Sequence, residues 1–211
     1  MSSIDELLNK LVKYPNSDIV ANPYHEEYAV DNLKQYFEYM FNQDGKRILL
    51  VAEAPGYKGC AITGIPLTSG RVFQEISHPL LLNLKDKIYL PRLESENTAT
   101  IAQRHIFDVI VWSYLATKKT TPLFWNSFPF HPHHQGNLSS NRSPNSSEVK
   151  YGSEILRELC KIYQPEAIAS IGKKGLAVLQ QTFSGQSFDY IRHPSYGGKS
   201  QFIEGMNNII K

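Results

Sequence analysis

The amino-acid sequence predicts an α/β fold with a mainly parallel four-stranded sheet, and three observations support this class. Four short runs are typical of buried strands, at 47–52, 122–125, 166–171 and 187–192. Segments with apolar residues at helical spacing alternate with the last of these runs. The 211 residues, 41% of them hydrophobic, suffice for one domain that needs no disulfide or structural metal to fold. Strands that alternate with helices of about 10–15 residues indicate a layered domain with a parallel sheet.

The N-terminal 45 residues are predicted to form a helical cover over a core that spans 46–211, all within a single domain. A first helix is predicted over 3–13, with Ser3 or Asp5 as its cap. A second helix is predicted over 25–43, where one stripe contains Tyr28, Leu33, Tyr36, Phe37 and Met40. A stripe of this kind indicates core packing rather than a cofactor site.

The segments after residue 46 are predicted from the same patterns. The strand at 47–52 stops at the turn Glu53-Ala54-Pro55-Gly56, and the strand at 122–125 leads into Asn126. Residues 131–147 are rich in Pro, Ser, Asn and His and are predicted to form a loop. Helices are predicted at 71–77, 99–116, 152–163, 173–183 and from 199 to the end.

The composition excludes several classes of protein. The two cysteines, Cys60 and Cys160, are too few for a disulfide framework, a four-cysteine zinc site or a four-cysteine iron–sulfur cluster. No uncharged run approaches the roughly 18–20 residues of a membrane helix, and the first residues are acidic where a secretory signal is basic. We therefore expect a cytoplasmic protein. Its net charge of +2 permits an anionic partner without arguing for one.

Candidate functional residues follow the predicted strands, because ligands of open α/β sheets bind beyond the carboxyl ends of the strands. The turn after Glu53 can point backbone N–H groups into a cleft. The amide of Asn126 can pair with the N3–H and O4 of uracil and rejects the reversed pattern of cytosine. His193 can stabilise negative charge on a departing base, and the hydroxyl of Ser195 can hold a phosphate. Taken singly, each is better explained by structure alone: the turn as an ordinary turn, Asn126 as a strand-end cap and His193 as a structural histidine.

Together, the motifs at these strand ends resemble those of the uracil-DNA glycosylase superfamily. The matching segments are Val51-Ala52-Glu53-Ala54-Pro55-Gly56, Trp125-Asn126-Ser127-Phe128-Pro129, Asn141-Arg142-Ser143-Pro144 and His193-Pro194-Ser195-Tyr196. The first motif is most similar to that of a bacterial and archaeal branch often found with an iron–sulfur cluster. The resemblance covers about 46–211.

The resemblance implies a three-layer α/β/α sandwich and a DNA-repair glycosylase that flips a damaged base out of the duplex and hydrolyses its N-glycosidic bond. Its implied catalytic residues are Glu53, Asn126 and His193. The implied pocket residues are Ala54, Pro55, Gly56, Tyr57, Leu67 and Phe73. The implied DNA contacts are Arg142, Ser195, Tyr196 and Lys199, with Tyr196 filling the gap left in the base stack. No metal or organic cofactor is implied, and the partner is DNA containing a damaged base. We expect a monomer that associates with the bacterial nucleoid through this function.

Four departures from the family pattern bear on the activity. Ala54 stands where several branches place a water-activating acid, which leaves Glu53 as the nearest candidate. Leu67 aligns with the phenylalanine that stacks on the flipped base, so Phe73 or Tyr57 would have to replace that ring. The cluster cysteines are absent. Gly56 replaces the tyrosine that excludes thymine in the most uracil-specific branch, so strict uracil preference does not follow.

Two other functions remain open at this point. A non-catalytic binder of damaged DNA or nucleobases would keep the fold, and Ala54 and Leu67 favour it. A metal-dependent hydrolase would use His131, His133 and His134 with His193, although no acid or cysteine near these histidines completes a ligand shell. We interpret the histidine-rich loop as solvated, or as a DNA contact together with Arg142. Lys173 and Lys174 follow a glycine turn and suit a phosphate as well as they suit solvent.

Overall fold

The computed structural model describes residues 3–90 and 106–210, and it confirms the α/β fold class. Its central sheet has the strand order β3-β2-β5-β6, and every neighbouring pair is parallel. The strands are β2 (Ile48–Ala52), β3 (Leu123–Asn126), β5 (Ala167–Ile171) and β6 (Asp189–Ile191). All residues of β2 and β3 are buried, as expected for parallel strands covered on both faces.

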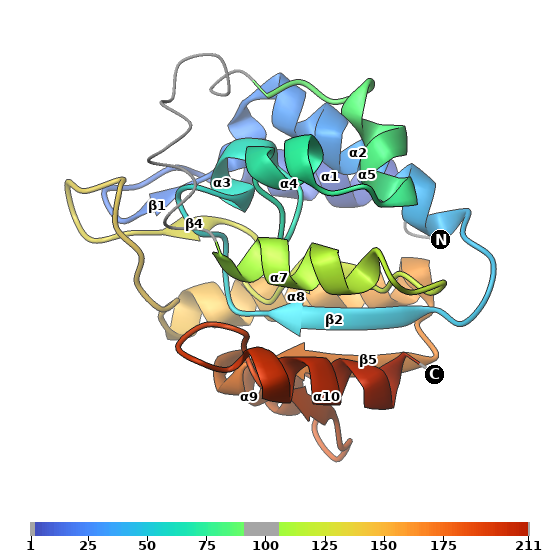
Figure 1. Ribbon diagram of the computed structural model, residues 1–211. Helices are drawn as coiled ribbons and strands as arrows, with labels where there is room; N and C mark the ends of the chain where they lie inside the picture. The colour runs from blue at the N-terminus through green and yellow to red at the C-terminus, as the bar shows by residue number, and fades with distance from the viewer. Residues whose placement is uncertain (1–2, 91–105, 211) are drawn as a thin grey trace.

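Helices cover both faces of this sheet. In Figure 1, α7 (Ile106–Leu115) lies in front of the sheet and α8 (Ser146–Tyr163) lies behind it. Two further helices follow β5 and β6 and pack against them, namely α9 (Lys173–Thr182) and α10 (Lys199–Ile209). None of the helices in the described parts of the chain is long and apolar enough to span a membrane.

The N-terminal segment shares the hydrophobic core of the sheet. Helix α1 (Ile4–Lys13) begins at Ser3, whose side chain accepts from the backbone of Glu6 in a capping box. The stripe on α2 (Glu27–Phe41) is core packing, because Tyr36 and Phe37 are fully buried and the ring of Phe37 lies 5.7 Å from that of Trp125. Between α1 and α2 lie the two-residue strand β1 (Val20–Ala21) and the short 3-10 helix η1 (Pro23–His25).

Short helices connect β2 to α7. Among the described residues of this stretch, up to residue 90, they are α3 (Cys60–Thr63), α4 (Gly70–Glu75) and α5 (Pro79–Lys85). The sequence predicts a helix at 71–77, which corresponds to α4. It predicts no helix over α3 or α5. The predicted helix at 99–116 is seen from residue 106 onward, and its earlier part lies outside the described residues.

The predicted loop at 131–147 is more ordered than its composition indicates. Residues His131–Pro132 form strand β4, which pairs antiparallel with β1. Helix α8 begins six residues earlier than predicted, because the side chain of Asn145 caps it and Glu148 completes a capping box. Both differences tie the segment after Asn126 to the body of the protein.

Candidate active site

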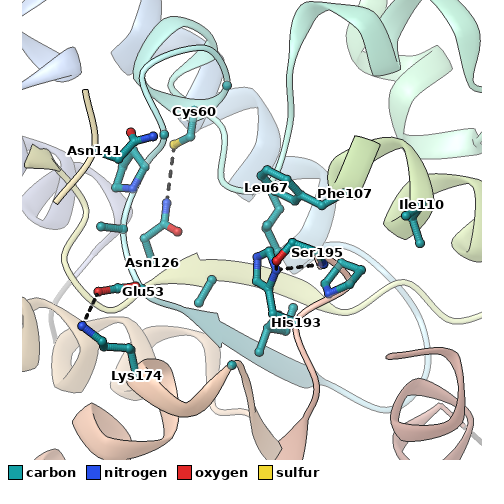
Figure 2. A pocket seen from close by; sticks show the side chains of 18 of the residues that line it. Glu53, Cys60, Leu67, Phe107, Ile110, Asn126, Asn141, Lys174, His193 and Ser195 are labelled. Atoms are coloured by element: carbon teal, nitrogen blue, oxygen red, sulfur yellow. Dashed lines mark hydrogen bonds and ion pairs between the residues drawn. The ribbon is translucent and has the colours of Figure 1, made fainter. Parts of the chain in front are cut away.

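A cleft of about 1230 Å³ opens at the carboxyl ends of the sheet strands. Its walls include Glu53 after β2, Asn126 at the end of β3, Gly172 after β5 and His193 after β6. The structure therefore brings the three predicted catalytic side chains into one cleft, and Figure 2 shows all three among the residues that line it. In-register pairing of Ala52 with Asn126 sets the ends of β2 and β3 side by side.

The backbone of Glu53 is fixed and its carboxylate faces a lysine. The carbonyl oxygen of Glu53 accepts from Ser127 Oγ at 2.7 Å and from the Phe128 N–H at 3.1 Å. Its side-chain Oε1 lies 3.6 Å from Lys174 Nζ and has no hydrogen-bond partner among the described residues. Oε1 itself is closed to solvent, whereas the Glu53 side chain as a whole is 36% exposed, so a water molecule in the cleft can reach the carboxylate only at its other oxygen.

Asn126 is almost fully buried at the end of β3, with 3% of its surface exposed. Its amide nitrogen donates to the sulfur of Cys60 at 3.6 Å. Figure 2 shows the amide nitrogen turned toward Cys60 and the carbonyl oxygen turned away from it. The amide therefore has one defined orientation, in which Oδ1 and the second N–H are left for a ligand.

The ring of His193 is held as a neutral donor. The backbone N–H of Ser195 donates to His193 Nδ1 at 3.2 Å, and Ser195 Oγ lies 2.7 Å from the same nitrogen. Because Nδ1 accepts, the proton of the neutral ring resides on Nε2. Burial lowers the pKa of His193, the nearby Arg192 lowers it further, and Glu53 opposes them. At neutral pH this histidine therefore offers an N–H without a full positive charge.

Leu67 and Phe107 form an apolar part of the cleft wall. Leu67 has a φ of 53°, which is rare for a leucine, and its carbonyl oxygen accepts from Trp112 Nε1 at 2.8 Å. The Phe107 ring comes from α7 and lies 5.2 Å from the ring of His193. Phe107 thus presents an aromatic face in the cleft, whereas the predicted substitute Phe73 is 4% exposed and does not line it.

Most of the other predicted residues line the cleft. Ala54, Pro55, Gly56 and Tyr57 line it after β2, and Ser195, Tyr196 and Lys199 form its rim after β6. Tyr196 has a φ of 50° and is 98% exposed. The loop around it is tight, since a Cβ on Gly198 would lie 2.2 Å from the His193 carbonyl oxygen.

The structure does not bring Arg142 to the cleft. Its guanidinium pairs with the buried carboxylate of Glu148 at 2.6 Å and donates to the carbonyl oxygens of Ile19 and His133. These contacts hold the loop against the segment that leads into β1, so the role of Arg142 in this structure is structural. Its neighbour Asn141 does reach the cleft, where its Oδ1 accepts from the Tyr57 N–H at 3.2 Å.

The loop histidines bind backbone carbonyl groups. His131 contacts the carbonyl oxygens of Pro55 and Leu138 at 3.0 and 3.1 Å, and its ring stacks on that of His133. Within residues 3–90 and 106–210, no group of three His, Cys, Asp or Glu side chains is arranged to hold a metal ion. His131 instead ties the turn after Glu53 to β4.

The side chains that line the cleft carry an excess of positive charge, whereas the whole chain is close to balance. Its lining includes one anionic side chain, Glu53, and five cationic ones: Lys58, Lys173, Lys174, Arg192 and Lys199. Lys173 and Lys199 are the first residues of α9 and α10, and neither helix has a side-chain cap. Free backbone N–H groups at these two helix N-termini add to the positive potential.

Sequence reasoning missed three residues of this site. The sequence places Cys60 in no site, gives Phe107 only as part of a helix, and gives Lys174 as a phosphate contact or a solvated lysine, without its pairing with Glu53. Residue spacing carries no signal for the first two, because they reach the cleft from α3 and α7 through tertiary packing. The pairing of Lys174 with Glu53 follows from α9 starting directly beside β2.

The fold is α/β/α, and its cleft lies at the carboxyl edge of a parallel sheet, which is where open α/β sheets commonly bind their ligands. The model of the uracil DNA glycosylase superfamily matches residues 39–206, and the chain belongs to that family. The crystal structure of wild-type SMUG2 from Pedobacter heparinus is similar in fold, with a TM-score of 0.59 and 14% sequence identity. That match covers 98% of this chain and 97% of the other. No protein in a search of curated sequences matches this chain.

Proposed function

We propose that this protein hydrolyses the N-glycosidic bond of uracil, or of a related deaminated base, in DNA. The observation that carries the proposal is the convergence of Asn126, His193 and Glu53, from three separate strand ends, on one cationic cleft. Membership of the glycosylase superfamily supports the reaction class.

Base recognition falls to Asn126. With one amide hydrogen engaged by Cys60, its Oδ1 accepts the N3–H of uracil and its second hydrogen is donated to O4. Cytosine presents an acceptor at N3 and a donor at position 4, so both pairings fail. Phe107 and Leu67 bound the space where the flipped base would lie, and the aromatic ring offers a stacking face.

Bond cleavage relies on His193. When the bond between C1′ and N1 breaks, its electron pair passes to the base and negative charge develops on O2. The Nε2–H of the neutral imidazole donates to that oxygen. A neutral donor suits this task because it stabilises the leaving anion without having to transfer a proton to it.

Hydration of the sugar completes the reaction. Glu53 is the anionic side chain of the cleft and accepts a proton from a water molecule whose oxygen bonds to C1′. Lys174 lies 3.6 Å from Oε1 and keeps the carboxylate oriented. This arrangement needs no acid at position 54, where the chain has alanine.

Binding of the DNA strand is assigned to the cationic rim. The N-termini of α9 and α10, with Lys173 and Lys199, suit backbone phosphates. Ser195 lies on the same rim with its hydroxyl donating to His193 Nδ1, and the exposed ring of Tyr196 is placed to fill the gap left by a flipped base.

Single-turnover excision from a uracil-containing oligonucleotide tests this function, with alkaline cleavage at the abasic site as the readout. Wild type should cut the uracil strand. Asn126→Asp should slow uracil excision about 10- to 100-fold, because a carboxylate cannot donate to O4. It should also raise the ratio of cytosine to uracil excision. Asn83→Asp, on the exposed face of α5, is the matched control and should leave both rates unchanged.

Two outcomes would contradict the proposal. Tight binding of uracil or abasic DNA with the intact strand recovered would identify a non-catalytic binder instead. Absence of cleavage on uracil, hypoxanthine and xanthine substrates would remove the enzymatic function altogether.

A further inference from the structure

A buried histidine bridges two segments beside the cleft. The ring of His131 is 2% exposed, and its Nδ1 lies 3.0 Å from the carbonyl oxygen of Pro55. Its Nε2 lies 3.1 Å from the carbonyl oxygen of Leu138. Pro55 belongs to residues 54–57, which line the cleft and which we call the cleft turn. His131 itself does not line the cleft, so any effect on the reaction must pass through the segments that it holds.

Both bonds of His131 require hydrogen on both ring nitrogens. A carbonyl oxygen can only accept, so each nitrogen must donate for both bonds to form. The neutral ring carries one N–H and one lone pair, and it can therefore bond to Pro55 or to Leu138 but not to both. In the neutral ring the other contact would set a lone pair against a carbonyl oxygen. The imidazolium is thus the form that matches this geometry.

The neighbouring His133 has no such pair of acceptors. Its ring stacks on that of His131, with the ring centroids 5.6 Å apart. His133 Nδ1 donates to the carbonyl oxygen of His134 at 3.0 Å, whereas its Nε2 is buried without a hydrogen-bond partner among the described residues. A second hydrogen on His133 would gain no bond there. Of the two stacked rings, only His131 therefore gains a hydrogen bond when it is protonated.

Four other ionisable groups surround the stacked rings. The Tyr57 ring lies 6.5 Å from the His131 ring, and Lys58 Nζ lies over that tyrosine, 5.3 Å from its centroid. Arg142 donates to the carbonyl oxygen of His133 at 3.0 Å and is paired with Glu148. Among the described residues, no carboxylate forms an ion pair with His131. The two carbonyl oxygens are therefore the groups that favour its charged form.

The contact with Pro55 falls in the middle of the cleft turn. Residues 54–56 belong to no helix or strand. The turn is held at its end, where the Tyr57 N–H donates to Asn141 Oδ1 at 3.2 Å. Residue 138 lies in the loop that leads to Asn141, so both bonds of His131 bear on the turn. Loss of the bond to Pro55 would loosen the turn directly, and loss of the bond to the loop would loosen it through Asn141.

We propose that His131 is a positioning residue whose doubly protonated ring fixes the cleft turn against the space for the flipped base, and that the loss of one of its protons loosens the turn. This inference rests on the proposed function. As the pH rises and the ring loses one hydrogen, one of the two bonds is lost. Uracil excision should then slow on the alkaline side, opposite to the side on which protonation of His193 would slow it.

The test is the pH profile of single-turnover uracil excision at saturating enzyme concentration. The wild-type rate should fall about five- to tenfold as His131 loses its proton, which is the weight of one hydrogen bond. His131→Gln offers a single donor group and does not titrate, so its rate should be low throughout and the alkaline fall should vanish. His134→Gln replaces an exposed histidine of the same loop and, as the matched control, should keep the wild-type profile.

DNA binding separates positioning from a general loss of structure. The cationic rim is unchanged in His131→Gln, so the Kd for a duplex with a non-hydrolysable abasic analogue should stay at the wild-type value while the excision rate falls. An alkaline fall in rate that persists in His131→Gln would overturn the inference. Equal losses of binding and of rate in this variant would overturn it too.

A measurement on the wild-type protein needs no variant to fold and no turnover. The nitrogen resonances of the His131 ring report its protonation, and the backbone amide resonance of Tyr57 reports the cleft turn. Both should titrate with the same midpoint. If wild type excises no uracil, the proposed function fails while these resonances still decide the role of His131. A Tyr57 amide that does not follow the ring would overturn the inference even in an active glycosylase.

Discussion

Two properties of His193 keep its ring ready to donate from Nε2: a backbone hydrogen bond to Nδ1 and a lowered pKa. Its backbone neighbour Ser195 supplies the N–H that makes Nδ1 an acceptor, and burial beside Arg192 keeps the ring uncharged. Protonation of Nδ1 would set two hydrogens against each other at 3.2 Å and break this bond. The geometry therefore selects the tautomer with the proton on Nε2, and the lowered pKa keeps that ring neutral.

The pH dependence of excision should report the His193 pKa. Because the pKa lies below the ordinary value of 6.5, the neutral ring persists to lower pH than in an exposed histidine. The acidic limb of the single-turnover rate should have its midpoint below pH 6.5. Arg192→Gln removes one cause of the lowering and should move that midpoint upward. A midpoint above pH 6.5 in wild type would contradict the assignment of this limb to His193. A midpoint that Arg192→Gln does not move would contradict it as well.

The candidate residues whose place in the cleft could be predicted from the sequence are those next to a strand end, while their roles stay predictions. Glu53, Asn126 and His193 each follow a recognisable apolar run, so a parallel sheet gathers them by topology alone. Cys60 and Phe107 reach the cleft from the helices α3 and α7. The sequence around each of these residues does not predict that position. Arg142 lies in a matching motif, yet a buried acid six residues later holds it away from the cleft.

At the scale of elements, the contact between α9 and β2 places the cation beside the carboxylate. Gly175 lies in the first turn of α9, where a Cβ would be 2.5 Å from the carbonyl oxygen of Val51. The missing side chain lets the helix lie directly against the strand that ends at Glu53. This approach is what brings Lys174 to 3.6 Å from the carboxylate.

Gly175→Ala should therefore lower both stability and excision. If helix propensity alone mattered, replacing Gly175 by alanine would raise the free energy of unfolding by about 1 kcal/mol. A lower free energy of unfolding would therefore report the clash between the new Cβ and the Val51 carbonyl oxygen. We expect a net loss of about 1–3 kcal/mol in urea unfolding, with slower uracil excision because Lys174 moves away from Glu53. The control, Ala177→Gly on the exposed face of α9, should lose about 1 kcal/mol from propensity and keep its activity. A stabilised and fully active Gly175→Ala would show that α9 can move without consequence.

The elements themselves were predictable where their pattern is local. The four sheet strands and the helices α1, α2 and α9 begin and end near the predicted residues. Strand β4 escaped prediction because its two residues pair with β1, more than a hundred positions away. The early start of α8 depends on the capping box of Asn145 and Glu148, inside a segment whose composition favours loops.

At the scale of the whole molecule, the uneven distribution of charge is the informative feature. The chain carries 22 basic and 20 acidic residues, which is close to balance. The cleft lining carries five cations and one anion. Outside the cleft the chain therefore has slightly more acidic than basic residues, and we expect attraction for a polyanion to be strongest at the face where the strands end.

Salt titration of DNA binding should count these contacts. For a duplex with a non-hydrolysable abasic analogue, the logarithm of the binding constant should fall linearly with the logarithm of the salt concentration. Each phosphate contact contributes a slope of about −0.9, so Lys199→Gln should reduce the magnitude of the slope by about one. Lys13→Gln, an exposed lysine on α1 away from the cleft, leaves the chain with the same net charge as Lys199→Gln and should not change the slope. Equal slopes for both variants would mean that net charge, and not the cationic rim of the cleft, governs the encounter with DNA.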